Sequence, residues 1–149
     1  MNKFNRKIEY ALMALQLMSE KRQGQLTSVS EICEVTGSPF DGTARVMQIM
    51  ANHGILKSDQ GVQGGYQIVR DLSKLSLFDL GEMILGPLGV VKCMRADESK
   101  CELLSSCNIR SPINEINSKL IQFYRQLRLN DVLKRAHRPP PLQDRSQFA

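Results

Sequence analysis

The sequence predicts a mainly α-helical fold with one small β-hairpin, an α+β fold in which helices dominate. Three observations predict it. Several segments place apolar residues at helical spacing, two short apolar runs flank a glycine-rich stretch, and a long helical pattern follows late in the chain. With 149 residues, 42% of them hydrophobic, the chain is long enough to form one ordinary core. No apolar run approaches the ~18–20 residues needed to cross a bilayer, so we expect no membrane partner.

The first two expected elements are helices. Apolar residues at steps of three and four predict a helix over residues 6–20. Ser28 followed by Glu31 is typical of a capping box, which opens a second, short helix. That helix is expected to end by Gly37, where glycine allows a positive φ.

A tight turn, a third helix and a hairpin follow. Pro39 disfavours the helical region at the residue before it, so the chain turns there. A third helix is expected over residues 40–52, and Gly54 provides its stop signal. Residues 55–58 and 66–70 are expected to be two strands joined by a glycine-rich loop.

Two more helices are expected after the hairpin. Ser76 with Asp79 repeats the capping pattern and predicts a helix that ends at Gly86. Ser111 as cap and Pro112 at the first helical position predict the start of a long helix. Its apolar residues form a seam that a lone helix cannot bury, so we expect a second copy of the chain to cover it: Ile113, Ile116, Leu120, Phe123 and Leu127.

Two short helices around a tight turn, followed by a hairpin, form the order of a winged helix-turn-helix. In that arrangement the second of the two helices enters the major groove of DNA. We expect the DNA-contacting residues in the turn, the third helix and the hairpin: Ser38, Asp41, Thr43, Arg45, Gln48, Lys57, Gln60 and Gln63. The alternative is that the same elements form a small α+β core with no DNA partner.

The moderately positive net charge is compatible with a nucleic-acid partner but does not by itself predict one. The formal net charge is +5. The last sixteen residues contain four basic residues and one acidic residue, so they account for +3 of it. Aromatic residues make up only 5% of the chain, which argues against a single-strand binding protein built on stacking platforms. From residue 136 the composition predicts a disordered, basic, proline-rich tail.

Three cysteines lie in one polar segment: Cys93, Cys101 and Cys107, separated by seven and then five residues. Thiolates grouped in this way can hold an iron–sulfur cluster or zinc. Neither interval is the C-x-x-C of a zinc ribbon, which makes zinc less favoured. Unligated thiols or a redox pair remain the alternative. Cys33 stands apart and is interpreted as a packed or surface thiol.

The N-terminal segment resembles an amphipathic helix and not a signal peptide, which predicts a cytoplasmic protein. In that compartment cysteines are more often ligands or redox thiols than disulfides. We find no nucleophile–base pair, phosphate-binding loop or histidine-rich metal centre, so the sequence does not predict an enzyme.

Several short motifs, taken together with the order of hairpin, cysteines and long helix, point to one family. They are Tyr10-Ala11-Leu12, Ser30-Glu31-Ile32, Asn52-His53-Gly54-Ile55-Leu56, Gly64-Gly65-Tyr66, Gly86-Pro87-Leu88 and Leu129-Asn130-Asp131-Val132-Leu133. With them the chain resembles the Rrf-two family of bacterial regulators over about residues 4–133. The resemblance implies a homodimer that binds a near-palindromic DNA operator, with the long helix as the dimerisation helix.

The resemblance also implies an iron–sulfur cluster, [2Fe-2S] or [4Fe-4S], on Cys93, Cys101 and Cys107. IscR-like members have a histidine three residues after the third cysteine, where this chain has Arg110, so it is closer to the NsrR-like branch. That branch implies a fourth ligand from the first helix of the other subunit, here Glu9, and nitric oxide or redox state as the signal. At the tip of the hairpin the family often has arginine where this chain has Gln60, so the operator is not carried over.

The sequence therefore predicts a winged helix-turn-helix domain over residues 1–75 and a linking helix with the cysteine loop over residues 76–110. A dimerisation helix over 111–135 and a tail over 136–149 complete the chain. The predicted function is that of a cytoplasmic, dimeric transcriptional regulator, more specifically a repressor controlled by an iron–sulfur cluster. Two alternatives stay open. They are a thiol- or zinc-based regulator on the same fold, and a small iron–sulfur electron-transfer protein.

Overall fold

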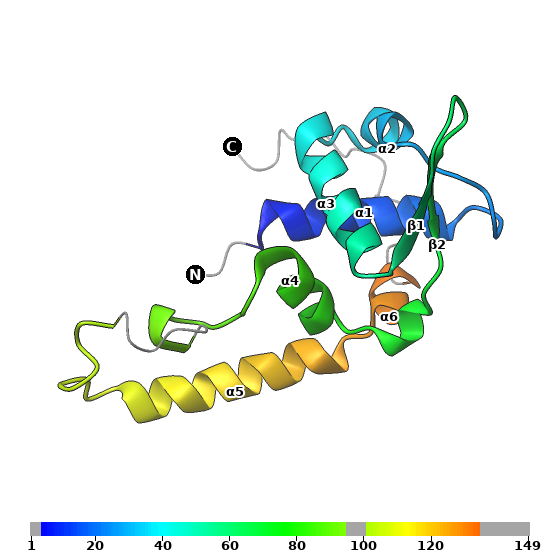
Figure 1. Cartoon of the computed structure of the whole chain (residues 1–149). Helices are drawn as coiled ribbons and strands as arrows, with labels where there is room; N and C mark the ends of the chain where they lie inside the picture. The colour runs from blue at the N-terminus through cyan, green and yellow to red at the C-terminus, as the bar shows by residue number, and fades with distance from the viewer. Residues whose placement is uncertain (1–3, 95–100, 135–149) are drawn as a thin grey trace, which may run out of the picture.

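The computed structural model describes residues 4–94 and 101–134 (Figure 1). These residues form helices and one two-stranded antiparallel sheet, so the predicted mainly α fold with a small hairpin is confirmed. No helix within the described ranges is long and apolar enough to cross a membrane. The elements are α1 (Arg6–Ser19), α2 (Val29–Thr36), α3 (Phe40–Asn52), β1 (Leu56–Asp59), β2 (Gly65–Ile68), η1 (Leu72–Lys74), α4 (Leu77–Leu85), η2 (Lys92–Met94), α5 (Arg110–Gln126) and α6 (Leu129–Lys134).

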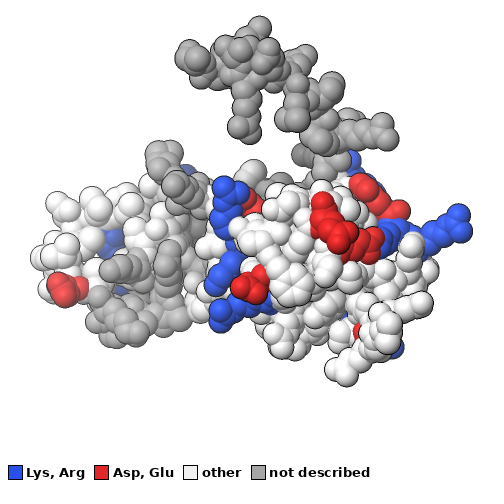
Figure 2. Space-filling view, turned by 90° about the horizontal axis from the view of Figure 1, so that it is seen from above, with Lys and Arg blue, Asp and Glu red and all other residues white. Residues whose placement is uncertain are grey.

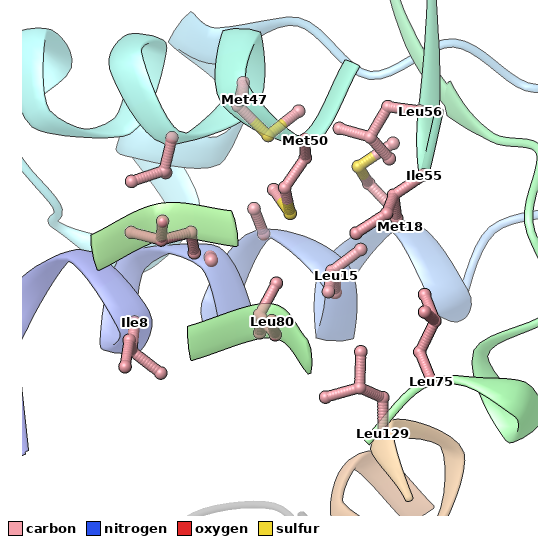
Figure 3. Close-up of a cluster of buried hydrophobic side chains, with 14 of the residues drawn as sticks. Ile8, Leu15, Met18, Met47, Met50, Ile55, Leu56, Leu75, Leu80 and Leu129 are labelled. Carbon is pink, nitrogen blue, oxygen red and sulfur yellow. The ribbon is translucent and has the colours of Figure 1, made fainter. Parts of the chain in front are cut away.

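One hydrophobic core joins the helices and the hairpin, with α1 lying between α3 and α4 (Figure 1, Figure 3). Figure 3 shows Leu15 of α1 between Met50 of α3 and Leu80 of α4. All three side chains are inaccessible to solvent. At the other end of α3, the ring of Tyr10 packs directly on Gly42, where an added Cβ would lie 2.9 Å from Tyr10 Cε2. Glycine at this position therefore lets α1 and α3 approach closely.

The helix-turn-helix forms at the predicted positions, but only half of the capping box expected at the start of α2 is present, because the Glu31 carboxylate pairs with Lys21. The side chain of Ser28 accepts a hydrogen bond from the Glu31 N–H at 3.1 Å and caps α2. Gly37 ends α2 with a φ of 71°, and its N–H donates to the Cys33 carbonyl at 2.9 Å. Glycine adopts this left-handed conformation without the steric cost of a Cβ. Pro39 then precedes the first turn of α3.

The hairpin is a short antiparallel ribbon in which Leu56 pairs with Ile68 and Asp59 pairs with Gly65. Thr27 extends the ribbon, because its backbone exchanges two hydrogen bonds of 2.9 Å with Tyr66. A Cβ on Gly65 would lie 2.8 Å from the Thr27 carbonyl oxygen, so glycine is needed for this close approach. Both strands lie within two residues of the predicted positions.

The C-terminal part corrects two expectations. The long helix begins at Arg110 with Ile109 as its cap residue, so Ser111 is not the cap. It ends at Gln126, whereas a single helix to residue 135 was expected. The helix stops because Leu127 adopts an extended backbone conformation. Its carbonyl oxygen accepts a hydrogen bond from the N–H of Leu77 at 2.8 Å instead of continuing the helix.

Helix α6 then returns to the body of the protein. Its residues Leu129 and Leu133 are buried in the same core as α1 and α3. Residues of α4, such as Leu80 and Ile84, belong to that core as well. The expected boundary at residue 75 therefore does not separate two cores, because α4 and α6 supply part of the apolar surface that covers α1. The expected disordered tail, residues 136–149, lies outside the described residues.

Candidate DNA-binding surface and cysteine segment

The outer face of α3 and the hairpin enclose an open groove of ≈ 620 Å³. Asp41, Arg45 and Gln48 line it from α3 and are exposed to solvent. Gln60 lines it from the hairpin. The geometry is that of a recognition helix beside a wing, because one helix fits the major groove while the hairpin lies along the adjacent backbone.

The tip of the hairpin carries no basic side chain. Gln60, Val62 and Gln63 are all exposed there, and Val62 is exposed over its whole surface (107% relative exposure). Lys57, at the base of the tip, lies 3.7 Å from the carboxylate of Asp59, which partly offsets its charge. The sequence analysis did not include Val62 among the candidate surface residues, although a single apolar residue in a polar, glycine-rich loop indicates an exposed position at the tip.

Two side chains expected at the DNA surface are buried inside the helix-turn-helix. Thr43 is completely buried and Ser38 is only 8% exposed, so neither side chain reaches the outer face of the helix-turn-helix. Their hydroxyl oxygens lie 2.8 Å apart. Because α3 turns by about 100° per residue, Thr43 faces inward while Arg45 faces outward. These two residues pack the turn instead.

Charge on this side of the molecule is mixed. Figure 2 looks onto α2 and α3 from above and shows Lys and Arg side chains interspersed with Asp and Glu. The described residues at the α5 end are mostly uncharged in the same view. Among the described residues on this face, no single large basic patch is seen, and such a mixed surface attracts DNA non-specifically only weakly.

The three cysteines of the predicted cluster lie between α4 and α5. Cys93, Cys101 and Cys107 are half-buried and form no disulfide. Thiolate sulfur is the donor type that an iron–sulfur cluster requires. However, among residues 4–94 and 101–134 no three Cys, His, Asp or Glu side chains converge closely enough to hold a metal ion. Within one chain the described thiols therefore fit a cluster by chemistry but do not form its site.

The predicted fourth ligand, Glu9, lies in the first turn of α1. Its carboxylate pairs with Arg6 at 2.8 Å, and its side chain is 28% exposed. A negative charge in this turn also favours the positive end of the helix dipole, which supplies a structural reason for an acid here. The ion pair is open to solvent, so a carboxylate oxygen is accessible from outside the chain.

The seam of α5 divides into two sets. Ile116 and Phe123 are exposed, at 47% and 54%. Ile113 and Leu120 are half-buried, and Leu120 lines a groove of ≈ 250 Å³ between α1, α4 and α5. Leu127, also expected at the dimer interface, packs against the core of its own chain. Its place in the seam is therefore corrected.

A helix-turn-helix with an exposed second helix beside an antiparallel hairpin defines a winged helix DNA-binding protein. The sequence model of the Rrf2 family, described as an iron-dependent transcriptional regulator, matches residues 4–135. The chain belongs to this family, as the motifs of the sequence indicated.

Individual relatives agree with this assignment. A protein of Aquifex aeolicus, named as an HTH-type transcriptional regulator, is 24% identical over 131 residues, which cover 87% of this chain and 90% of the relative. The structure of CymR, the global cysteine regulator of B. subtilis, matches 92% of this chain and all of its own with a TM-score of 0.70 and 19% identity. The structure of T. potens IscR matches 96% of this chain and 94% of its own, with a TM-score of 0.65 and 20% identity.

Proposed function

We propose that this Rrf2-family regulator is a cytoplasmic homodimer that represses transcription by binding a near-palindromic operator. We further propose that an iron–sulfur cluster sensing nitric oxide or redox state controls its affinity for that operator. The observation that carries the proposal is the exposed α3 face beside the hairpin, joined through α4 and α5 to a segment with three half-buried thiols. On this proposal α3 is the recognition helix, Arg45 contacts guanine and Gln48 contacts adenine.

The structure offers a physical connection between the cysteine segment and the DNA-binding body. The Asn117 side-chain oxygen of α5 accepts the Val90 N–H at 3.0 Å, three residues before Cys93. Near the C-terminal end of α5, the Arg125 guanidinium lies 4.6 Å from the centre of the Phe78 ring of α4. Helix α5 is thus held at its middle by the Val90 backbone and near its C-terminal end by Phe78, so a change in the cysteine segment can alter the position of α5 relative to α4.

In a dimer built on α5, that position sets the distance between the two recognition helices. The distance has to match about one helical turn of DNA, ~34–36 Å, for both half-sites to be bound. When bound, a cluster supplies a redox-active group that nitric oxide or oxidants modify. Cys93, Cys101 and Cys107 would hold it together with Glu9 of the partner subunit, whose oxygen is a harder ligand than sulfur.

A thiol-based regulator is the second candidate. It is favoured by the absence of a three-donor group among the described residues and by the fold shared with CymR. In this case Cys93, Cys101 and Cys107 act as free or paired thiols and no iron is bound. Metal analysis separates the candidates, because only the first predicts iron with acid-labile sulfide.

DNA recognition is tested by selecting duplexes from a random pool with the wild-type protein. We expect one enriched near-palindromic sequence. Arg45→Ala should weaken binding to it by ~1–3 kcal/mol and weaken binding to a shuffled duplex much less. The control is Lys119→Ala, which removes a positive charge from an exposed i,i+4 pair on α5. Equal loss on both duplexes would show that Arg45 contacts phosphate alone.

The cluster is tested by anaerobic purification, iron and sulfide analysis, and absorption spectra before and after nitric oxide. Alanine at each of the three cysteines should abolish the cluster. Glu9→Ala should alter the spectrum and speed cluster loss, whereas Glu34→Ala, which removes an exposed acid of α2, should not. Protein free of iron and sulfide would favour the thiol candidate. A Glu9→Ala spectrum identical to wild type would remove Glu9 from the site.

A further inference from the structure

Three side-chain hydroxyls in series join α3 to α2 inside the helix-turn-helix. Thr43 Oγ1 lies 2.8 Å from Ser38 Oγ, and Ser38 Oγ lies 2.8 Å from Thr36 Oγ1. Thr36 Oγ1 lies 2.7 Å from the carbonyl oxygen of Ile32 in α2. Thr43 is fully buried and Ser38 nearly so, which removes most competition from water and strengthens each hydrogen bond. We call these three residues the hydroxyl series.

Each hydroxyl has a single proton to donate, and this determines which group is the donor in each hydrogen bond of the hydroxyl series. The Ile32 carbonyl can only accept, so the Thr36 hydroxyl donates to it. Because that proton is then used, Ser38 donates its hydroxyl proton to Thr36, and Thr43 donates its own to Ser38. The Ser38 backbone N–H also donates to Thr36 Oγ1, at 3.2 Å. Every hydroxyl in the series therefore donates once: Thr43 and Ser38 donate towards α2, and Thr36 donates within α2. Ser38 Oγ also lies 3.9 Å from Cys33 Sγ of α2.

The remaining contacts of α3 hold it less specifically. Pro39, its cap residue, makes no side-chain cap hydrogen bond. Besides Thr43, the buried face of α3 consists of three apolar side chains, Val46, Met47 and Met50. Apolar contacts are non-directional and methionine is flexible, so this packing constrains the rotation of α3 less sharply than a directional contact does. A hydrogen bond is directional, so the hydroxyl series adds a sharper constraint to the one that the contact of Tyr10 with Gly42 supplies.

We propose that Ser38 and Thr43 are positioning residues that fix the rotation and register of α3, and thereby determine sequence specificity. This inference rests on the proposed role of α3 as the recognition helix. Hydrogen bonds from Arg45 and Gln48 to base edges require donor–acceptor distances of about 2.7–3.2 Å. A small rotation of α3 moves both side chains out of that range. Contacts to phosphates tolerate the same rotation because attraction between charges decreases gradually with distance and has little directional preference.

The test uses matched variants of the full chain. Thr43→Val keeps the shape of the side chain and removes the hydroxyl, and Ser38→Ala interrupts the middle of the hydroxyl series. Thr43→Ser keeps the hydroxyl and serves as the rescue variant. Ser76→Ala is the control for stability, because it removes an equally buried hydroxyl from the start of α4. Circular dichroism at 25 °C establishes that each variant is folded.

The readout is the ratio of two affinities, measured by fluorescence anisotropy. One is for the duplex that the wild-type protein selects from a random pool, and the other is for a shuffled duplex of equal composition. Thr43→Val and Ser38→Ala should lower the ratio about tenfold, the size of effect expected for a misplaced base contact. Binding to the shuffled duplex should stay within about twofold of wild type. Thr43→Ser and Ser76→Ala should keep the wild-type ratio.

Three outcomes overturn the inference. An unchanged ratio in Thr43→Val and Ser38→Ala shows that the hydroxyl series does not affect specificity. Equal losses on both duplexes, or unfolding of Ser38→Ala while Ser76→Ala stays folded, show that the series only stabilises the domain. If the wild-type protein selects no sequence at all, the proposed function fails and this inference fails with it. The behaviour of wild type therefore distinguishes the two failures.

Discussion

Residues close together on one element of this protein can be either buried or exposed, because their side chains leave the backbone in different directions. In α3, Thr43 faces the interior and Arg45 faces the groove, although they are two positions apart. In the hairpin, Val62 is fully exposed at the tip. An apolar, uncharged tip can contact the walls of a DNA groove but attracts no phosphate. The hairpin should therefore add little salt dependence to DNA binding.

The position of the hairpin on DNA can be tested at Val62. Val62→Lys places a positive charge at the tip, so it should tighten binding to a random duplex and steepen the salt dependence by about one ion. The measurement is the slope of the logarithm of affinity against the logarithm of salt concentration. Val69→Lys, at the opposite end of the hairpin, is the control and should leave the slope unchanged. An unchanged slope in Val62→Lys would place the tip away from DNA.

Among the elements, α4 shows how a short helix is fixed at its start. Ser76 and Asp79 form the predicted capping box. The Ser76 side chain accepts the Asp79 N–H at 3.1 Å, and Asp79 accepts the Ser76 N–H at 2.8 Å. A nine-residue helix is marginal alone, so this cap and the burial of its apolar face stabilise it together. Loss of such a cap costs about 0.5–2 kcal/mol.

The capping box makes stability depend on pH. Burial raises the pKa of Asp79, but hydrogen bonds from the Ser76 backbone and hydroxyl, with Arg128 and Arg125 nearby, lower it below its usual 3.8 overall. A lowered pKa in the folded state gives stability that is present above the unfolded pKa and is lost as the pH falls through the folded pKa. Stability should therefore decrease as the pH falls below about 4.

Urea unfolding at about pH 5 and about pH 3 measures this effect. Asp79→Asn should be less stable than wild type at the higher pH and should lose less stability on acidification. Asp131→Asn, at an exposed position in the first turn of α6, is the control and should follow the wild-type pH profile. Parallel profiles for Asp79→Asn and wild type would show that the carboxylate does not contribute.

At the scale of the whole molecule, α5 extends away from the body while α6 returns to it (Figure 1). Ile116 and Phe123 stay exposed on α5, although Leu129 and Leu133 complete the core. Exposed large apolar side chains in a row along one helix are typical of an interface. A second copy of α5 is the partner that our proposal assigns to them.

Dimerisation is tested with Ile116→Asp and Phe123→Asp. Both side chains are exposed in the single chain, so each substitution leaves the fold intact but places an unpaired charge in a dimer interface. Gel filtration should show monomers. Gln122→Asp changes an exposed residue off the seam and should remain dimeric. These positions test the dimer better than Leu120 does, because Leu120 lines the groove of its own chain and its substitution could also destabilise the fold. Dimers in both variants would exclude this seam as the interface.

Most local features of the fold were predictable because short-range chemistry determines them. The capping pairs Ser28–Glu31 and Ser76–Asp79 and the stop at Gly37 are each set by residues within three or four positions. Helix spacing and the glycine-rich loop predicted α3 and the hairpin, and the family motifs predicted Rrf2 membership. The exposed candidates Arg45, Gln48 and Gln60 were predictable from polarity alone.

The sequence by itself determined the order of elements, the winged helix-turn-helix and the family, because each depends on nearby residues or on a linear order of motifs. Only the tertiary structure decided that Thr43 and Ser38 face inward, that α5 ends at Gln126, and that Leu127 belongs to its own core. A polar side chain on a helix has the same local chemistry whether it faces water or a neighbouring helix. Its role depends on contacts between segments far apart in the chain, and those contacts exist only once the core has formed.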